Sequence, residues 1–146
     1  MLKINFNGAL FTEDKKSGIG VIIRNSQGLI LASLSQLLPQ DYTIAEVEAL
    51  AAVTALQFAR ELDILEVVLE GDSEIIITTL TDEHYPLTTY DLILQDANLL
   101  FMSFTQLRYS HIRKEGNMVT HNLARYARNV SILLYGWRML HHMSTL

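Results

Sequence analysis

The sequence contains no cysteine and only two prolines among its 146 residues. Without cysteine, disulfide bonds and thiolate zinc sites are excluded. Seven glycines, no low-complexity run and no internal repeat argue against a disordered or repetitive chain. Charged residues are sparse at 18%, whereas 49% of the residues are hydrophobic, which is enough to build a buried core. A chain of this length fits one domain, with little room for a second.

A long apolar run is also missing near the start, where Lys3, Asn5 and Asn7 interrupt the apolar residues. We therefore expect neither a signal peptide nor a membrane span, and an intracellular protein, nuclear or cytoplasmic, is the default. Acidic residues outnumber basic ones by 16 to 11, which gives a net charge of −5. This balance argues against unaided capture of a nucleic acid, although divalent metals could bridge carboxylates to a phosphate backbone.

Hydrophobic periodicity predicts an α/β domain with a five-stranded mixed sheet flanked by helices. Period-two alternation predicts a first strand that ends at Asn7-Gly8-Ala9, and turn residues separate the next two strands into an antiparallel meander. A helix then begins at the capping-box pattern of Thr43 and Glu46. The element order is βββαβααβα, and the expected ranges are strands 2–9, 18–24, 29–34, 66–71 and 105–111, with helices 43–59, 74–80, 91–102 and 116–127.

Polar residues gather where these strands end. Asn7 follows the first strand and Asp72 follows the fourth, and a right-handed crossover would make these two strands parallel. Glu46 lies in the opening turn of the first helix, and His121 lies inside the last one. Because α/β sheets bind ligands at the carboxyl ends of their strands, we expect these four residues to converge.

Four short motifs resemble those of ribonuclease H, and most closely its plant reverse-transcriptase-like, retroelement-derived branch. They occur in the family's order, over about Leu2 to Ala127. One such motif would be weak evidence, but four in register with the strand order are specific. The motifs are Phe6-Asn7-Gly8-Ala9, Ala45-Glu46-Val47-Glu48-Ala49-Leu50, Glu70-Gly71-Asp72-Ser73, and His111 followed by Asn117 and His121-Asn122-Leu123-Ala124.

This resemblance implies a metal-dependent endonuclease that cuts RNA in an RNA–DNA hybrid with two Mg²⁺ ions, for which Mn²⁺ can substitute. The family's four acid positions fall on Asn7, Glu46, Asp72 and His121, and its mobile helper histidine falls on His111. Glu46, Asp72 and Asn7 would then be the metal ligands. The resemblance makes an RNA–DNA hybrid or another nucleic acid the expected partner.

Two of the four acid positions do not hold acids. Asn7 stands where the family has the aspartate that bridges both metals, and a neutral amide removes one negative charge from the centre. We expect this change to weaken metal binding and catalysis by roughly several kcal/mol. Natural loss and deliberate substitution both account for such an amide. His121 is a milder change, because imidazole can ligate a metal or accept a proton.

Other interpretations of single residues remain open at this level. Glu46 could serve only the capping box, in which case Glu48 is the competing site residue. Asn117 could contact substrate or simply begin the last helix. Lys114 could contact phosphate or belong to a solvated basic group with Arg113 and Arg125.

The residues support two main candidate functions, and they divide the chain into two segments. The first function is RNase H-type cleavage, weakened at Asn7, and the alternative is an inactive module of the same fold that binds nucleic acid or protein. A related exonuclease is a weaker third interpretation, because the last motif lacks an exonuclease acid pattern. We expect the domain to cover 1–129. Residues 130–146 would form an apolar tail or extra helix that packs on the domain or on a partner, including a second copy in a homodimer.

Overall fold

One mixed sheet forms the centre of the protein, whose computed structural model describes residues 1–82, 87–129 and 132–136. The strands lie in the order β5-β4-β1-β2-β3-β6. Strands β1, β2 and β3 form the predicted antiparallel meander, and β4 and β5 extend it in parallel. The strand bounds are β1 Leu2–Phe11, β2 Lys16–Arg24, β3 Ile30–Leu38, β4 Glu66–Gly71, β5 Gln106–His111 and β6 Ile132–Gly136.

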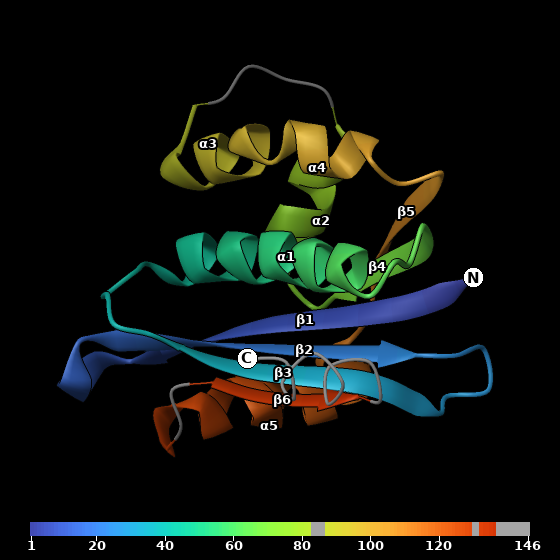
Figure 1. Cartoon of the computed structure of the whole chain (residues 1–146). Coiled ribbons are helices and arrows are strands. Elements are labelled where there is room, and N and C mark those ends of the chain that lie inside the picture. The colour runs from blue at the N-terminus through green and yellow to red at the C-terminus, as the bar shows by residue number, and fades with distance from the viewer. Residues whose placement is uncertain (83–86, 130–131, 137–146) are drawn as a thin grey trace.

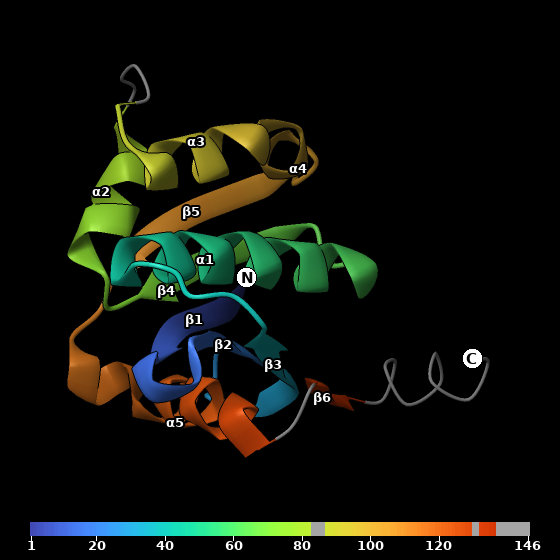
Figure 2. The same cartoon turned by 90° about the vertical axis from the view of Figure 1, so that its left-hand side faces the viewer.

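Helices cover both faces of this sheet (Figures 1 and 2). Helices α1 to α4 lie on one face, with α3 and α4 forming an outer layer above α1, and α5 lies on the opposite face. The predicted α/β fold is therefore confirmed, with the expected mixed sheet at its centre. The helix bounds are α1 Ile44–Glu61, α2 Glu74–Thr81, α3 Thr89–Asp96, α4 Asn98–Met102 and α5 Met118–Tyr126, with short 3₁₀ turns at Thr12–Asp14, Lys114–Asn117 and Ala127–Asn129.

The main core lies between the sheet and α1. Ile4 and Phe6 of β1 and Leu69 of β4 are fully buried beneath the helix. On the helix itself, Leu56 is fully buried and Phe58 is nearly so. Each such side chain contributes about 1.5–3 kcal/mol when it is fully withdrawn from water. The alanines of α1 leave little side chain between helix and sheet, so the helix lies close to the strand ends that carry the polar residues.

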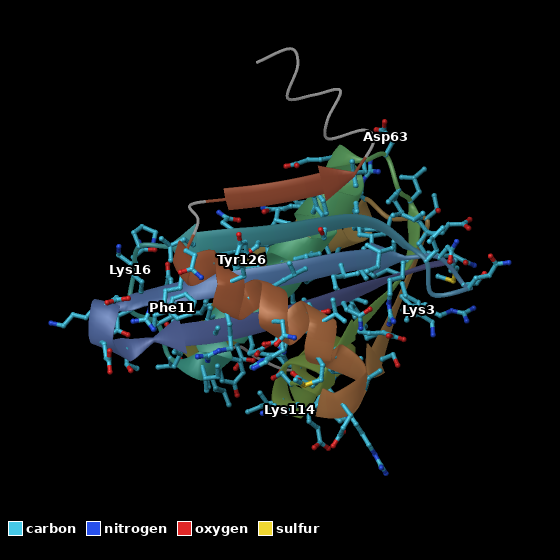
Figure 3. The ribbon with its side chains drawn as sticks, turned by 90° about the horizontal axis from the view of Figure 1, so that it is seen from below. Lys3, Phe11, Lys16, Asp63, Lys114 and Tyr126 are labelled. Atoms are coloured by element: carbon cyan, nitrogen blue, oxygen red, sulfur yellow. The ribbon has the colours of Figure 1, made fainter. Side chains whose placement is uncertain are left out.

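Two glycines of β2 let α5 lie directly against the sheet. A Cβ atom at Gly20 would stand 2.3 Å from the carbonyl oxygen of Thr120, and one at Gly18 would stand 2.3 Å from that of Ala124. Both distances are far below van der Waals contact, so neither position tolerates a side chain without displacing the helix backbone. Figure 3 shows α5 crossing the strands on this face. The start of α5, and with it His121, is therefore held close to the centre of the sheet.

Three expectations about element bounds are corrected. Strand β1 continues past Asn7-Gly8-Ala9 to Phe11, because β2 goes on pairing with it up to the Phe11–Lys16 pair. The helix expected over 91–102 is two helices, separated by a turn at Ala97.

The third correction concerns the tail. Residues Ile132–Gly136 form a strand rather than a helix, and this strand pairs antiparallel with β3. Pairing satisfies the backbone groups that β3 would otherwise present at an open sheet edge. Residues 130–131 and 137–146 lie outside the described residues, so packing of the whole tail and a homodimer through it stay predictions.

Candidate active site

Asn7 and Asp72 come together where two parallel strands part. The β1–β4 pairing ends at Phe6 and Gly71, and the next residue on each strand carries the polar side chain. The Asn7 amide nitrogen Nδ2 donates to both Asp72 carboxylate oxygens, at 3.3 Å to each. Asn7 is buried, and Asp72 is partly buried. The predicted neighbourhood of these two residues is present, with the amide donors of Asn7 turned toward the carboxylate.

A buried carboxylate from α1 completes this centre. Glu48 is only 6% exposed, and its Oε1 accepts a hydrogen bond from the backbone N–H of Gly8 at 3.1 Å. Its other oxygen, Oε2, is buried with no hydrogen-bond partner among the described residues. Burial raises the pKa of Glu48 to about 8, the Gly8 N–H opposes this rise, and the negative charge of Asp72 adds to it. Glu48 is therefore largely protonated at neutral pH.

The expectation that Glu46 faces the site is wrong in geometry. Glu46 is half-buried, and its carboxylate accepts a hydrogen bond from the backbone N–H of Thr43 at 3.0 Å. The Thr43 hydroxyl accepts in turn from the Glu46 N–H, which completes a capping box. The residue that faces Gly8 and Asp72 is Glu48, the competing assignment.

A signal for Glu48 was available in the sequence. Because an α-helix turns about 100° per residue, Glu48 lies on the same face as Ala52, Ala55 and Ala59, all of which are buried. Glu46 already had a partner in Thr43. A carboxylate on the apolar side of a helix is costly unless it has a function, which favours Glu48 as the site residue.

The two predicted histidines lie on either side of the loop that leads into α5. His111 ends β5, and its Nε2 lies 3.2 Å from the backbone carbonyl oxygen of Asp72. The ring of His111 is exposed, so it can reach solvent or a ligand from the rim of the centre. His121 is half-buried in the first turn of α5. Neither histidine is an acid that could replace the charge missing at Asn7.

Asn117 is built into the fold, so a substrate contact by its side chain stays a prediction. Its side chain is 1% exposed, its Nδ2 donates to the carbonyl oxygen of Phe6 at 3.0 Å, and its Oδ1 accepts from Asn5. Asn5 also donates to Glu70 and accepts from Arg24. This network fastens the start of α5 to β1 beside the site. By contrast, Lys114 is exposed and remains available to a ligand.

Replacing Asn117 by alanine should lower stability more than it changes ligand binding. Asn117→Ala removes two buried hydrogen bonds and leaves the Phe6 carbonyl without its side-chain donor, so we expect a loss of about 2 kcal/mol. The exposed Asn122→Ala on the same helix should change stability by less than about 0.5 kcal/mol. Urea unfolding of both variants measures this difference. Equal stability of the two would show that the network does not hold α5.

The side chains at this centre do not fit a two-metal site. Mg²⁺ prefers negatively charged oxygen ligands. The central position offers a neutral amide whose N–H groups face Asp72, and Glu48, whose pKa is raised by burial, must release a proton before it can act as an anionic ligand. Among the residues that the structure describes, no three histidine, aspartate or glutamate side chains converge as metal ligands. The buried Oε2 of Glu48, which has no hydrogen-bond partner among the described residues, would suit a cation, and it is not sufficient for two.

A comparison with known protein families assigns the chain to one of them. Residues 5–127 match the model of a family described as reverse transcriptase-like. The chain belongs to the reverse transcriptase-like family. The match covers every residue of the site described above, and it places the chain in the RNase H-like superfamily, as the resemblance implied. Among curated proteins, none matches the sequence.

Solved structures give the same fold for this reverse transcriptase-like domain. RNase H1 from the halophilic archaeon Halobacterium salinarum is similar with a TM-score of 0.78 and 22% identity, over 88% of this chain and 97% of that one. The N-terminal RNase H domain of Rv2228c from Mycobacterium tuberculosis has a TM-score of 0.78 and 18% identity, over 88% and 93%. LC11-RNase H1, solved in complex with an RNA/DNA hybrid, has a TM-score of 0.78 and 21% identity, over 88% and 97%.

The sequence predicts no membrane span, and the described helices agree with this prediction. Over the described residues, every helix is too short or too polar to cross a bilayer.

Proposed function

We propose that this domain binds nucleic acid in the manner of an RNase H domain and cleaves RNA–DNA hybrids only weakly. The observation that carries the proposal is the pair of hydrogen bonds from Asn7 to Asp72. At the centre of the site, these bonds use an amide where the family resemblance implies a metal-bridging carboxylate. The catalytic roles of Glu48, Asp72, His111 and His121 rest on this resemblance, and the contacts of Glu48 and His111 with Asp72 support the first three.

The weakness follows from electrostatics. A two-metal hydrolase stabilises the charge that develops on the attacking and leaving oxygens. This centre holds the carboxylate of Asp72 and a second one, Glu48, whose pKa is raised by burial and which must first lose a proton. Mg²⁺ or Mn²⁺ dependence of the residual activity therefore stays a prediction, and an attenuated rate is expected with either ion.

The charge distribution supports nucleic-acid binding on one side only. Arg113, Lys114 and Arg125 are exposed around the start and end of α5, on the same side of the sheet as Asn7. No lysine or arginine occurs between Arg60 and Arg108. A backbone phosphate would thus find its cationic contacts near α5, and the interaction should weaken steeply as salt rises.

The unmodified protein tests the proposal directly. We expect a fluorescent RNA–DNA hybrid to bind at low salt, with affinity that falls as salt rises, and to be cut slowly in Mg²⁺ or Mn²⁺. Lys114→Glu should lower the affinity several-fold, whereas Asp63→Lys, at the far end of the sheet, should leave the contacts near α5 intact. Absence of binding at low salt would overturn the nucleic-acid role, and rapid cleavage by the unmodified chain would overturn the attenuation.

A second candidate function is a module that no longer cuts and that binds protein. The specific observation in its favour is the layer of α2, α3 and α4, which lacks basic residues yet exposes several large apolar side chains. Such a surface is poorly suited to phosphate and well suited to a polypeptide. Its expected signature is a complete absence of cleavage in either metal, even with excess enzyme.

A further inference from the structure

The outer helical layer exposes three large apolar side chains around one exposed acid. Leu92 of α3 and Leu99 and Met102 of α4 are 51%, 83% and 76% exposed. Asp96 is exposed between them, and Asp91 on the inner side is buried. Three large side chains in water on two consecutive short helices are unusual for a surface that meets only solvent. We call Leu92, Asp96, Leu99 and Met102 the acidic face.

Helix α5 has the opposite charge and a similar apolar content. Met118, Val119 and Tyr126 are 42%, 57% and 46% exposed, and Arg125 is exposed beside them. The segment 116–129 contains arginines but no aspartate or glutamate. Tyr126 lies on the outward side of α5 where the helix crosses the sheet (Figure 3). We call Met118, Val119, Arg125 and Tyr126 the basic face.

The two faces lie on opposite sides of the molecule. Helices α3 and α4 form the outermost layer above the sheet, and α5 lies below it, in both views of the ribbon (Figures 1 and 2). The acidic face of one copy therefore cannot fold back onto its own basic face. It is open to the basic face of another copy, with apolar side chains meeting apolar ones and Asp96 available to Arg125.

We propose that the acidic face docks on the basic face of a second copy of this chain, so that copies associate head to tail. The single charges of the two faces, Asp96 and Arg125, favour this pairing, since two acidic faces or two basic faces would bring like charges together. Contacts between different patches are heterologous, and they form open chains of copies unless the rotation between neighbours closes a ring. Screening by salt should weaken the association, because the charged groups are exposed.

Sedimentation velocity on the whole chain tests this proposal. We expect the average mass to rise with protein concentration at about 0.02 M salt and to return to the monomer value at about 0.5 M. Leu99→Lys on the acidic face and Val119→Glu on the basic face should each abolish association, and both positions are exposed, so the fold should survive. Circular dichroism and thermal unfolding of each variant check that the fold is intact.

Mixing the two variants gives the decisive result. Val119→Glu keeps its acidic face and Leu99→Lys keeps its basic face, so an equimolar mixture should form a dimer and nothing larger. A wild-type chain that stays monomeric at low salt would overturn the proposal. So would association that survives in both single variants, which would point to another surface such as the β6 edge, or a mixture that stays monomeric.

Discussion

Asn7→Asp should turn this domain into a metal-dependent nuclease. The substitution replaces the two N–H donors that face Asp72 with a carboxylate, and so restores the negative charge missing from the centre. We expect the rate of RNA–DNA hybrid cleavage in Mg²⁺ to rise at least about 100-fold, which corresponds to roughly 2.7 kcal/mol of transition-state stabilisation. A gel assay with labelled hybrid measures the rate.

The same variant should respond to metal in a way that does not depend on activity. Without a divalent ion, two facing carboxylates repel each other where the unmodified protein has hydrogen bonds, so Asn7→Asp should unfold at a lower temperature. Mg²⁺ should raise that temperature again, because a ligand that binds only the folded state stabilises it. The unmodified chain should show little change with Mg²⁺.

Matched variants separate the site from its surroundings. Asn7→Asp/Glu48→Gln should lose the gained activity, whereas Asn7→Asp/Glu46→Gln should keep it, because Glu46 serves the capping box. If Asn7→Asp shows no more cleavage than the double variant with Glu48→Gln, the RNase H-type site is not latent in this chain. If Glu46→Gln abolishes the activity instead, the assignment of Glu48 is wrong.

Glu48→Gln should stabilise the protein at alkaline pH and have little effect in acid. The folded pKa of Glu48 is about 8, above the ordinary value of 4.5. Below pH 4.5 both the folded and unfolded chains hold the proton. Between pH 4.5 and 8 the unfolded chain releases it and the folded chain does not, so stability falls as pH rises. Above about pH 8 both forms are ionised, and the penalty reaches its limit.

The size of this effect follows from the two pKa values. The difference between 4.5 and about 8 corresponds to a penalty of order 3–5 kcal/mol above pH 8. Glutamine keeps an oxygen for the Gly8 N–H and presents amide donors to the negative Asp72. We therefore expect Glu48→Gln to exceed the unmodified protein by a few kcal/mol in urea unfolding at pH 8.5, and to match it at pH 4.

A control on the same helix makes the result specific. Glu46→Gln removes the carboxylate of the capping box two residues away and should leave the pH dependence of stability unchanged. The quantity to compare is the difference in free energy of unfolding between Glu48→Gln and the unmodified protein. If this difference is the same at pH 5 and at pH 8.5, the pKa of Glu48 is not elevated. That outcome would also remove the charge argument for attenuated metal binding.

Much of the fold was predictable because its signals are local. Alternation over β1, the turn residues between β2 and β3, and the capping box before α1 each depend on a few neighbouring residues. The motif around Asp72 placed that residue at a strand end, and the structure brings it beside Asn7 as expected. The strand at 132–136 was missed, because a short apolar run does not distinguish helix from strand until a sheet edge is available.

The sequence by itself determined that an amide stands at the Asn7 position, that Asp72 lies near it, and that carboxylates occur early in α1. Only the tertiary structure decided which carboxylate joins them. Glu46 and Glu48 are two residues apart, so their side chains point about 200° apart around the helix. The packing of the alanine-rich face of α1 on the sheet turned Glu48 inward to the Gly8 N–H and left Glu46 outside with Thr43. Burial of one face of α1 decides which of the two glutamates points inward, because the local motif fits either residue.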